Sequence, residues 1–276
     1  MKRQKKRKIK WILLMLLLVI LLGIIVFLAM EILGQKAMLK QETTDVAMTA
    51  PETKDIVVED DGVTITYNGE KYVKQQIESI LSQSVAIDEL IICDDISTDR
   101  TAEIVRAIGD ERIRFIVNEK NLGFIENFHK AICHTNGDYI FLADQDDIWE
   151  TDKIERILEN MNATKALAMC TNYKLIDENG NSLGDKKNYN IPSFVLTVSE
   201  HIQKITLPML AYDNLVQGCT YCFTKDVKEI FLAVNNRSVA HDYQIMLISA
   251  NLGGAYFLNE ELVQYRLHSS NTIGFS

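Results

Sequence analysis

From residue 61 onward the sequence alternates short apolar runs with amphipathic stretches of ten or more residues. The apolar runs have the length and composition of buried strands, and they cover residues 63–67, 89–95, 112–118, 138–143 and 165–176. The stretches between them place apolar residues at helical spacing, and they cover residues 70–83, 98–109, 124–135 and 151–161. Strands that alternate with helices of this length form βαβ units. The alternation therefore predicts an α/β fold with a doubly wound, mostly parallel sheet flanked by helices.

Two of the predicted strands end in aspartates. Asp94 and Asp95 follow one apolar run, and the stretch ADQDDIW, residues 143–149, follows another. Taken singly, an aspartate at a strand end most often caps the next helix or forms a turn. Two such groups on one parallel sheet lie at the same edge, where ligands of open α/β sheets bind. We therefore expect both groups to line one crevice.

Asp144, Asp146 and Asp147 place three carboxylates within four positions. Like charges this close repel one another unless a cation or a proton lies between them. Carboxylate oxygens are hard ligands, which suit Mg²⁺ or Mn²⁺, and such ions are commonly shared with the phosphates of a substrate. The cluster predicts a divalent cation bridged to a diphosphate.

The charge distribution argues against nucleic acid as a partner. The formal charge is -9, and residues 1–40 hold nine Lys and Arg against one Glu, or +8, so the remaining 236 residues carry -17. Nucleic-acid binding relies on basic surfaces, which this body lacks. The five cysteines lie mostly in apolar stretches, and we interpret them as reduced core residues, including the pair Cys219 and Cys222.

The N-terminus predicts a single-pass membrane anchor. Residues 1–10 carry seven basic side chains, and the next twenty residues have no charge, which is long enough to span a bilayer. A signal peptide is the alternative, but its apolar core would be shorter. We predict a basic cytoplasmic segment at 1–10, a transmembrane helix at 11–33 and a polar stalk at 34–60. Positive residues remain inside, so residues 61–276 are predicted to lie outside.

Seven motifs in residues 63–276 resemble a known family. They are TYNGEKY (66–72), CDDISTDRT (93–101), NLGFIENFHKA (121–131), DYIFLADQDDIW (138–149), QGC (217–219), HD (241–242) and YRLHSSNTIG (265–274). In this order they resemble the family 2 glycosyltransferases, and most closely the bacterial rhamnosyltransferase-like members. The block from 121 to 149 is the most specific part of the resemblance.

The resemblance implies a GT-A fold and an inverting transfer of sugar from a nucleotide-diphosphate donor to a glycan or lipid-linked acceptor of a cell-surface polysaccharide. Asp242 would be the general base. Asp144 and Asp146 would hold Mg²⁺ or Mn²⁺. The residues implied to bind the donor are Tyr67, Asn68, Asp94, Asp95, Asp144, Gly218, Arg266 and His268.

Asp242 opens a helix-like stretch, residues 242–253, whose Ile245, Leu247 and Ile248 we expect to be buried. A helix N-terminus favours the ionised form of a carboxylate, which a general base requires. Spacing alone favours a helix N-cap at this position, whereas the order of the family motifs favours the general base.

Two positions depart from the family pattern. Ile96 stands where the family turn usually has glycine, and a β-branched residue tolerates positive φ poorly. Residues 57–65, VVEDDGVTI, place three acids and a glycine where the family has a long apolar first strand, so we expect a short or weak strand there.

The predicted orientation conflicts with a cytoplasmic nucleotide-sugar donor. The anchor and stalk resemble the start of membrane-anchored wall-polymer transferases, which act outside the cell. The alternative function is therefore a catalytically impaired, membrane-anchored module that arose from a fused or truncated reading frame. A nucleotidyltransferase would require a Gly-rich, basic phosphate loop, whereas residues 66–72 hold one Gly and one Lys.

Overall fold

The computed structural model describes residues 59–184, 200–211, 214, 217–269 and 271. All of them belong to one compact unit, Val57–Ser276. The predicted basic segment, transmembrane helix and all of the stalk except Glu59 and Asp60 lie outside the described residues. Within the part that is described, no helix combines the length and apolar character needed to cross a membrane.

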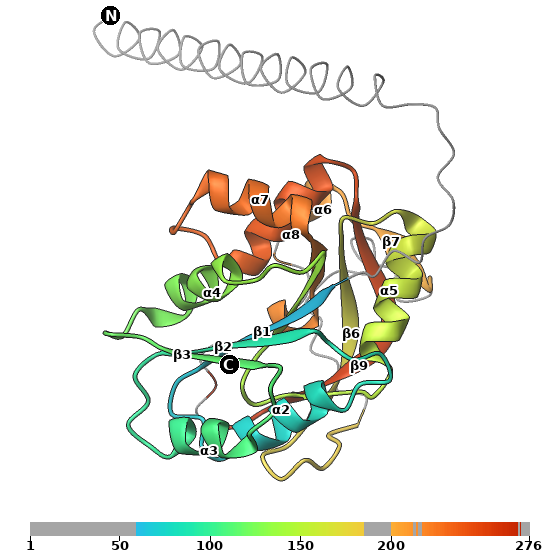
Figure 1. Ribbon diagram of the computed structural model, residues 1–276. Helices are drawn as coiled ribbons and strands as arrows, with labels where there is room; N and C mark the ends of the chain where they lie inside the picture. Colours follow the sequence, from blue (N-terminus) through green and yellow to red (C-terminus); the bar gives the residue numbers. More distant parts are fainter. Residues whose placement is uncertain (1–58, 185–199, 212–213, 215–216, 270, 272–276) are drawn as a thin grey trace, which may run out of the picture. The chain divides into compact units, whose positions relative to one another are not determined.

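The core of the domain is one mixed sheet of nine strands (Figure 1). The strands run in the order β3-β2-β1-β4-β8-β6-β9-β5, with β7 paired to β9. Their bounds are Asp60–Thr66 (β1), Glu89–Asp94 (β2), Ile113–Val117 (β3), Tyr139–Ala143 (β4), Ile148–Trp149 (β5), Ala168–Ile176 (β6), Ile202–Lys204 (β7), Cys222–Thr224 (β8) and Ala255–Arg266 (β9).

The two halves of the sheet differ in strand direction. Strands β3, β2, β1 and β4 are all parallel, as the helix-length connections between them require. Strand β8 is antiparallel to both of its neighbours, and β5 and β7 are antiparallel to β9. Strands β6 and β9 pair in parallel. The prediction of a mostly parallel sheet is therefore right for the first half and for β6 with β9, and wrong for β5, β7 and β8. The antiparallel strands are only two or three residues long, so the sequence shows no periodicity for them.

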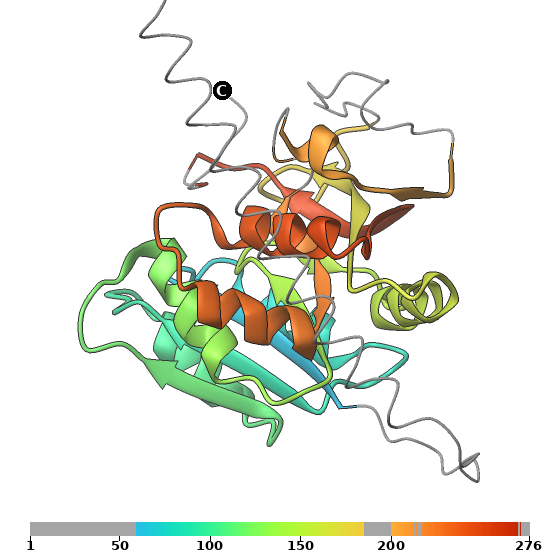
Figure 2. The same cartoon turned by 90° about the horizontal axis from the view of Figure 1, so that it is seen from above.

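Helices cover both faces of the sheet (Figure 1). On one face lie α4, α6, α7 and α8, and Figure 2 shows α4, α7 and α8 beside one another above the strands. On the other face lie α2, α3 and α5. The helix bounds are Val73–Leu81 (α2), Thr101–Ile108 (α3), Gly123–Cys133 (α4), Lys153–Thr164 (α5), Leu207–Leu210 (α6), Lys225–Val234 (α7) and His241–Asn251 (α8).

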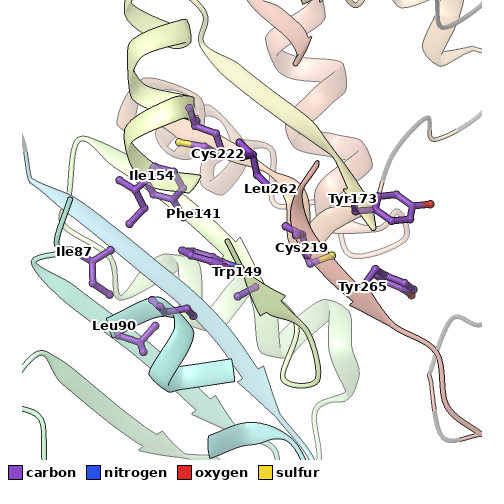
Figure 3. Packing of buried hydrophobic residues seen from close by; sticks show 14 of the residues in the cluster. Ile87, Leu90, Phe141, Trp149, Ile154, Tyr173, Cys219, Cys222, Leu262 and Tyr265 are labelled. Atoms are coloured by element: carbon purple, nitrogen blue, oxygen red, sulfur yellow. The ribbon is translucent and has the colours of Figure 1, made fainter. Parts of the chain in front are cut away.

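Alternate residues of the central strands supply the two cores. Ile91 and Leu142 pack under α4 and α8, whereas Leu90 and Phe141 point to the opposite face. This alternation is the two-residue period of a strand buried on both sides. Figure 3 shows the second core, in which Phe141 and Trp149 lie between Leu90 and the two cysteines Cys219 and Cys222.

Strand β1 contradicts the expectation of a weak first strand. It has seven residues and lies at the centre of the parallel half, paired with β2 on one side and β4 on the other. Both of its acids are buried: the Asp61 carboxylate accepts the backbone N–H groups of Asn136 and Gly137 at 2.6 and 2.7 Å, whereas Asp60 Oδ1 has no hydrogen-bond partner among the described residues. Gly62 packs closely against Leu90, since a Cβ there would lie 2.9 Å from Leu90 Cδ1 and the leucine side chain would have to shift.

Candidate functional site

Most of the predicted site residues lie at one edge of the sheet. The parallel strands β1, β2 and β4 all end there, so the loops after Thr66, Asp94 and Ala143 emerge side by side. The 3-10 turn Gly218–Thr220, the start of α8 and the end of β9 supply the remaining predicted residues. As predicted, the two aspartate groups lie at one edge of one sheet; the strands that they follow, β2 and β4, lie on either side of β1.

Asp94 and Asp95 have structural partners within the protein. The Asp94 carboxylate accepts the Thr66 and Ser97 hydroxyls at 2.8 and 2.5 Å. The Asp95 carboxylate accepts the backbone N–H groups of Leu122 and Gly123 at 2.7 and 2.8 Å, so it satisfies the N-terminus of α4. Helix capping and turn formation, the common roles of aspartate at a strand end, are therefore observed here.

Hydrogen bonds join the loop after β1 to the loop after β2. Asn68 has φ 48°, and its side-chain oxygen accepts the Thr98 backbone N–H at 2.8 Å. Its own backbone N–H donates to the Ser97 hydroxyl at 2.9 Å. Tyr67 beside it is 51% exposed, which leaves its ring accessible to a ligand.

The turn after β4 is held by the end of β9. Asp147 is buried, and one of its oxygens accepts the Arg266 backbone N–H at 2.9 Å. The Arg266 side chain donates from Nε to the Asp146 backbone carbonyl at 2.7 Å. His268 Nε2 lies 2.7 Å from Asp146 Oδ2, so this predicted metal ligand faces the histidine.

Arg266, which the family resemblance implies binds the donor, does not face outward. It is 2% exposed, and its guanidinium stacks 4.6 Å from the Tyr72 ring centre. Nη2 donates to the Gln75 side chain at 2.9 Å and Nε to the Asp146 carbonyl. A guanidinium packed beneath the turn in this way supports the aspartates instead of presenting its donors to a ligand.

The carboxylates of this turn strongly influence one another. Burial, together with the nearby charges of Asp146 and Asp242, raises the pKa of Asp144 to about 7. Burial also raises the pKa of Asp147 well above its usual value, with Asp146 and Asp144 contributing. Charges that disfavour each other in this way are relieved by a proton or by a cation. Asp242, from α8, therefore belongs to the same site as the β4 aspartates.

A buried lysine lies beneath the cluster. Lys153 is fully buried, its Nζ donates to the Cys219 carbonyl at 3.0 Å, and it lies 3.7 Å from the Trp149 ring centre. Burial lowers the pKa of Lys153 to about 7, although nearby Cys219 and Asp147 oppose that shift. The amine supplies at most a partial counter-charge, so the aspartates still favour a cation.

The ligand atoms of Asp144, Asp147 and Cys219 lie within 4.8 Å of one another. Burial raises the pKa of the Cys219 thiol well above its usual value, so it stays protonated and is a poor ligand for a hard cation. The predicted pair of ligands was Asp144 and Asp146, and in this structure Asp146 faces His268 instead.

Asp242 lies in the first turn of α8. It is the second residue of α8 rather than its N-cap, which is Ala240, so the capping interpretation is not borne out. The Asn214 side-chain amide donates to its Oδ2 at 2.9 Å. Gly218 faces the same carboxylate, because a Cβ at 218 would lie 3.1 Å from Asp242 Cβ. Gly218, which the family resemblance implies binds the donor, leaves room here for the Asp242 side chain.

His241 anchors the start of α8. Its ring stacks on Phe128 with centres 3.8 Å apart, and burial lowers the pKa of the imidazole to about 4. The ring is therefore neutral at physiological pH. Of the face we expected to be buried, Ile245 is fully buried, while Leu247 and Ile248 are half-buried.

Three residues of the site were not identified from the sequence. Gln145 bonds the backbone of Tyr67, Asn214 bonds Asp242, and Lys153 lies beneath the aspartates. The position of Gln145 between two aspartates was a sequence signal that could have identified it. The lysine lies at helical spacing in 151–161, where it gives the ordinary signal of a surface residue, and nothing in the sequence singles out Asn214.

The sequence profile described as "Glycosyl transferase family 2" matches residues 61–230. The chain belongs to this family. It is 31% identical over 208 residues to a Bacillus subtilis glycosyltransferase whose name assigns it to teichuronic acid biosynthesis, covering 74% of this chain and 77% of that one. It is 27% identical over 224 residues to the dTDP-rhamnosyl transferase of Shigella flexneri, covering 76% and 73%.

Among solved structures, the domain shares its fold with S. aureus TarS 1–349, crystallised with UDP, at a TM-score of 0.60 and 17% identity. The match covers 76% of this chain and 60% of that one, so this chain spans less than two thirds of TarS 1–349. The family and this likeness confirm a glycosyltransferase domain with a GT-A-like fold.

Proposed function

We propose that the domain transfers a sugar, with inversion, from a nucleotide-diphosphate donor to a glycan or lipid-linked acceptor, in a reaction that depends on Mg²⁺ or Mn²⁺. The observation that carries this proposal is the meeting of the aspartates after β4 with Asp242. Asp144 and Asp147 have ligand atoms within 4.8 Å of the Cys219 thiol, and Asp242 lies against the adjacent Gly218. These carboxylates come from the end of β4 and the start of α8, so folding alone brings them together.

The names of similar proteins support the donor class. One is named for dTDP-rhamnosyl transfer, and TarS was crystallised with UDP. The Bacillus protein is named for the synthesis of a cell-surface polymer. For this chain we propose a UDP- or dTDP-linked sugar and a cell-surface polysaccharide or its lipid-linked precursor.

The residues present fit a divalent cation. Asp144 and Asp146 would hold it, with one oxygen of Asp146 bonded to His268, and the buried Asp147 has a ligand atom within 4.8 Å of that of Asp144. Carboxylate oxygens are the ligands that Mg²⁺ and Mn²⁺ prefer. When bound, the ion would neutralise charge on the leaving diphosphate.

Asp242 would act as the general base. It would take the proton from the acceptor hydroxyl while that oxygen attacks the anomeric carbon on the face opposite the nucleoside diphosphate. The new C–O bond forms as the bond to the diphosphate oxygen breaks, and the electron pair leaves with the diphosphate. Asn214 donates to Oδ2 of the base and would keep it oriented.

We also propose a single-pass membrane protein with its N-terminus in the cytoplasm, on the basis of seven basic residues before the apolar segment. The alternative of an impaired module rested on a weak first strand and on an orientation that conflicts with a cytoplasmic donor. Strand β1 is complete, which removes the first of these two grounds and supports the active enzyme.

Sugar transfer by the purified full-length chain tests this function. UDP-glucose, UDP-GlcNAc and dTDP-rhamnose would each be supplied with Mn²⁺, with Mg²⁺ and with a chelator. We expect donor turnover with at least one sugar, and its loss on chelation. Failure of both UDP and dTDP to bind the folded protein in the presence of metal would refute the proposal.

A further inference from the structure

Gln145 stands between Asp144 and Asp146, but its side chain turns toward another loop. Its Oε1 accepts the Tyr67 backbone N–H at 2.9 Å, and its Nε2 donates to the Tyr67 backbone carbonyl at 3.1 Å. Both polar atoms of the amide therefore bind one residue. Paired bonds of this kind fix the position and the plane of the groups they join.

Gly69 makes room for this arrangement. A Cβ at position 69 would lie 2.3 Å from Gln145 Oε1 and 2.8 Å from Gln145 Cδ, and its three nearest atoms all belong to Gln145. Both distances are far below van der Waals contact, so a side chain at 69 and the amide at 145 cannot occupy these places together. The Gly69 carbonyl also accepts the N–H groups of Tyr72 and Val73 at the start of α2, which fixes the loop on that side.

The Gln145 amide joins the loop after β4 to the loop after β1 by hydrogen bonds. The pairing of the two strands places these loops near each other but does not fix the distance between them. Strands β1 and β4 are parallel neighbours, with Thr64 opposite Ala143, so the loops that follow them leave the sheet together. One loop carries the predicted nucleotide contacts Tyr67 and Asn68. The other carries the aspartates proposed to meet the diphosphate.

We propose that Gln145 is a positioning residue, which sets the spacing between the nucleotide end and the diphosphate end of the donor site. This rests on the function proposed above. A donor bound at both ends gains affinity when the two loops are held in place beforehand, because less conformational freedom is lost on binding. The residue between the aspartates thus acts on the nucleotide loop, while its neighbours act on the metal and the phosphates.

The first test compares Gln145→Met and Gln145→Glu with the unmodified full-length chain. Met keeps the length of the side chain and removes both hydrogen bonds, whereas Glu keeps the acceptor but places an oxygen against the Tyr67 carbonyl. We expect the Kd of UDP or dTDP with Mn²⁺, by calorimetry, to rise about tenfold in both, as expected for the loss of one or two hydrogen bonds. Gln264→Ala, which removes an amide bonded to Glu150, is the matched control and should leave the Kd unchanged.

The second test crosses position 145 with position 69. Gly69→Ala alone should weaken nucleotide binding, because its methyl group displaces the Gln145 amide. In the Gln145→Ala background the methyl group has space, so the double variant should bind as well as Gln145→Ala alone. Penalties that simply add would overturn the proposal, since independent sites are additive.

The outcomes separate the two proposals. If the unmodified chain binds neither UDP nor dTDP, the proposed function fails. If it binds one of them and the Gln145 variants bind it equally well, only the role of Gln145 fails. Melting temperatures of all the variants accompany the binding data, and a Gln145 variant that melts like the unmodified chain but binds tenfold more weakly supports positioning.

Discussion

The residues of the site divide into those that would meet substrate and those that hold others in place. Asp144, Asp146 and Asp242 are proposed to act on the donor, the metal and the acceptor. Asp95 and Arg266 bond mainly to the protein itself, one at the N-terminus of α4 and the other beneath the Asp146 turn. Mutation of the three residues that would meet substrate should alter turnover. Mutation of Asp95 or Arg266 should alter both turnover and the stability of the fold.

Asn214 should affect turnover more than donor binding. Replacement by Ala removes the N–H that bonds Asp242 Oδ2, and a hydrogen bond to a charged group is worth about 1.5–3 kcal/mol. We expect kcat to fall about tenfold or more while the donor KM stays within about twofold, measured by steady-state kinetics. Asn160→Ala, which removes an amide bonded only to its own helix, is the control. A rise in KM at unchanged kcat would contradict the assigned role.

Ile96 should be a strained residue whose replacement by glycine stabilises the fold. Its φ is 60°, in the left-handed region that a β-branched side chain tolerates poorly. Ile96→Gly should raise the free energy of unfolding by about 1 kcal/mol, measured by denaturant unfolding. Gly109→Ala, at φ 68° with open space around it, should lower it by a similar amount. A loss of stability in Ile96→Gly would show that side-chain packing outweighs backbone strain.

At the scale of elements, the central strand β1 begins with two buried acids, Asp60 and Asp61. Asp60 is 4% exposed, and its backbone N–H donates to the Asp88 carboxylate at 2.8 Å. Burial raises the pKa of Asp60 to about 7, with Asp88, Asp61 and Asp138 adding to the effect. This group of acids lies at the start of β1, whereas the candidate site lies beyond its end.

Asp60 should make the protein less stable as the pH rises. Between its ordinary pKa near 4 and its folded pKa of about 7, the folded state binds more protons than the unfolded state, so stability is lost as the pH rises through 7. Asp60→Asn removes this loss. After allowance for solvent screening, we expect a gain of about 2 kcal/mol at pH 8 relative to the unmodified chain, and little difference at pH 4. Thermal melting across this pH range tests it, and a difference that does not vary with pH would contradict it.

For the whole molecule, the sequence predicted the family, the parallel half of the sheet and the edge at which the site lies. These depend on local patterns, such as the alternation over 63–176 and aspartates that follow apolar runs. The antiparallel strands β5, β7 and β8 were not predicted, because each of them is too short to show a period. The partners of Gln145 and Arg266 were not predicted either, since they lie 78 and 120 residues away along the chain.

The chain's orientation in the membrane is a prediction for the whole molecule. The basic N-terminal segment predicts that a reporter fused to the C-terminus is found outside the cytoplasm. Paired alkaline phosphatase and fluorescent protein fusions measure this directly. A reporter that is active only in the cytoplasm would refute the orientation and place the domain with a cytoplasmic donor.

Donor turnover and nucleotide binding by Asp242→Asn, measured side by side in the full-length chain, test the central claim most directly. The amide keeps the shape of the side chain but cannot take a proton from the acceptor. We predict that sugar transfer falls at least about a hundredfold, while the Kd of UDP or dTDP with Mn²⁺ stays within about threefold. Transfer at the unmodified rate would contradict the account of this site.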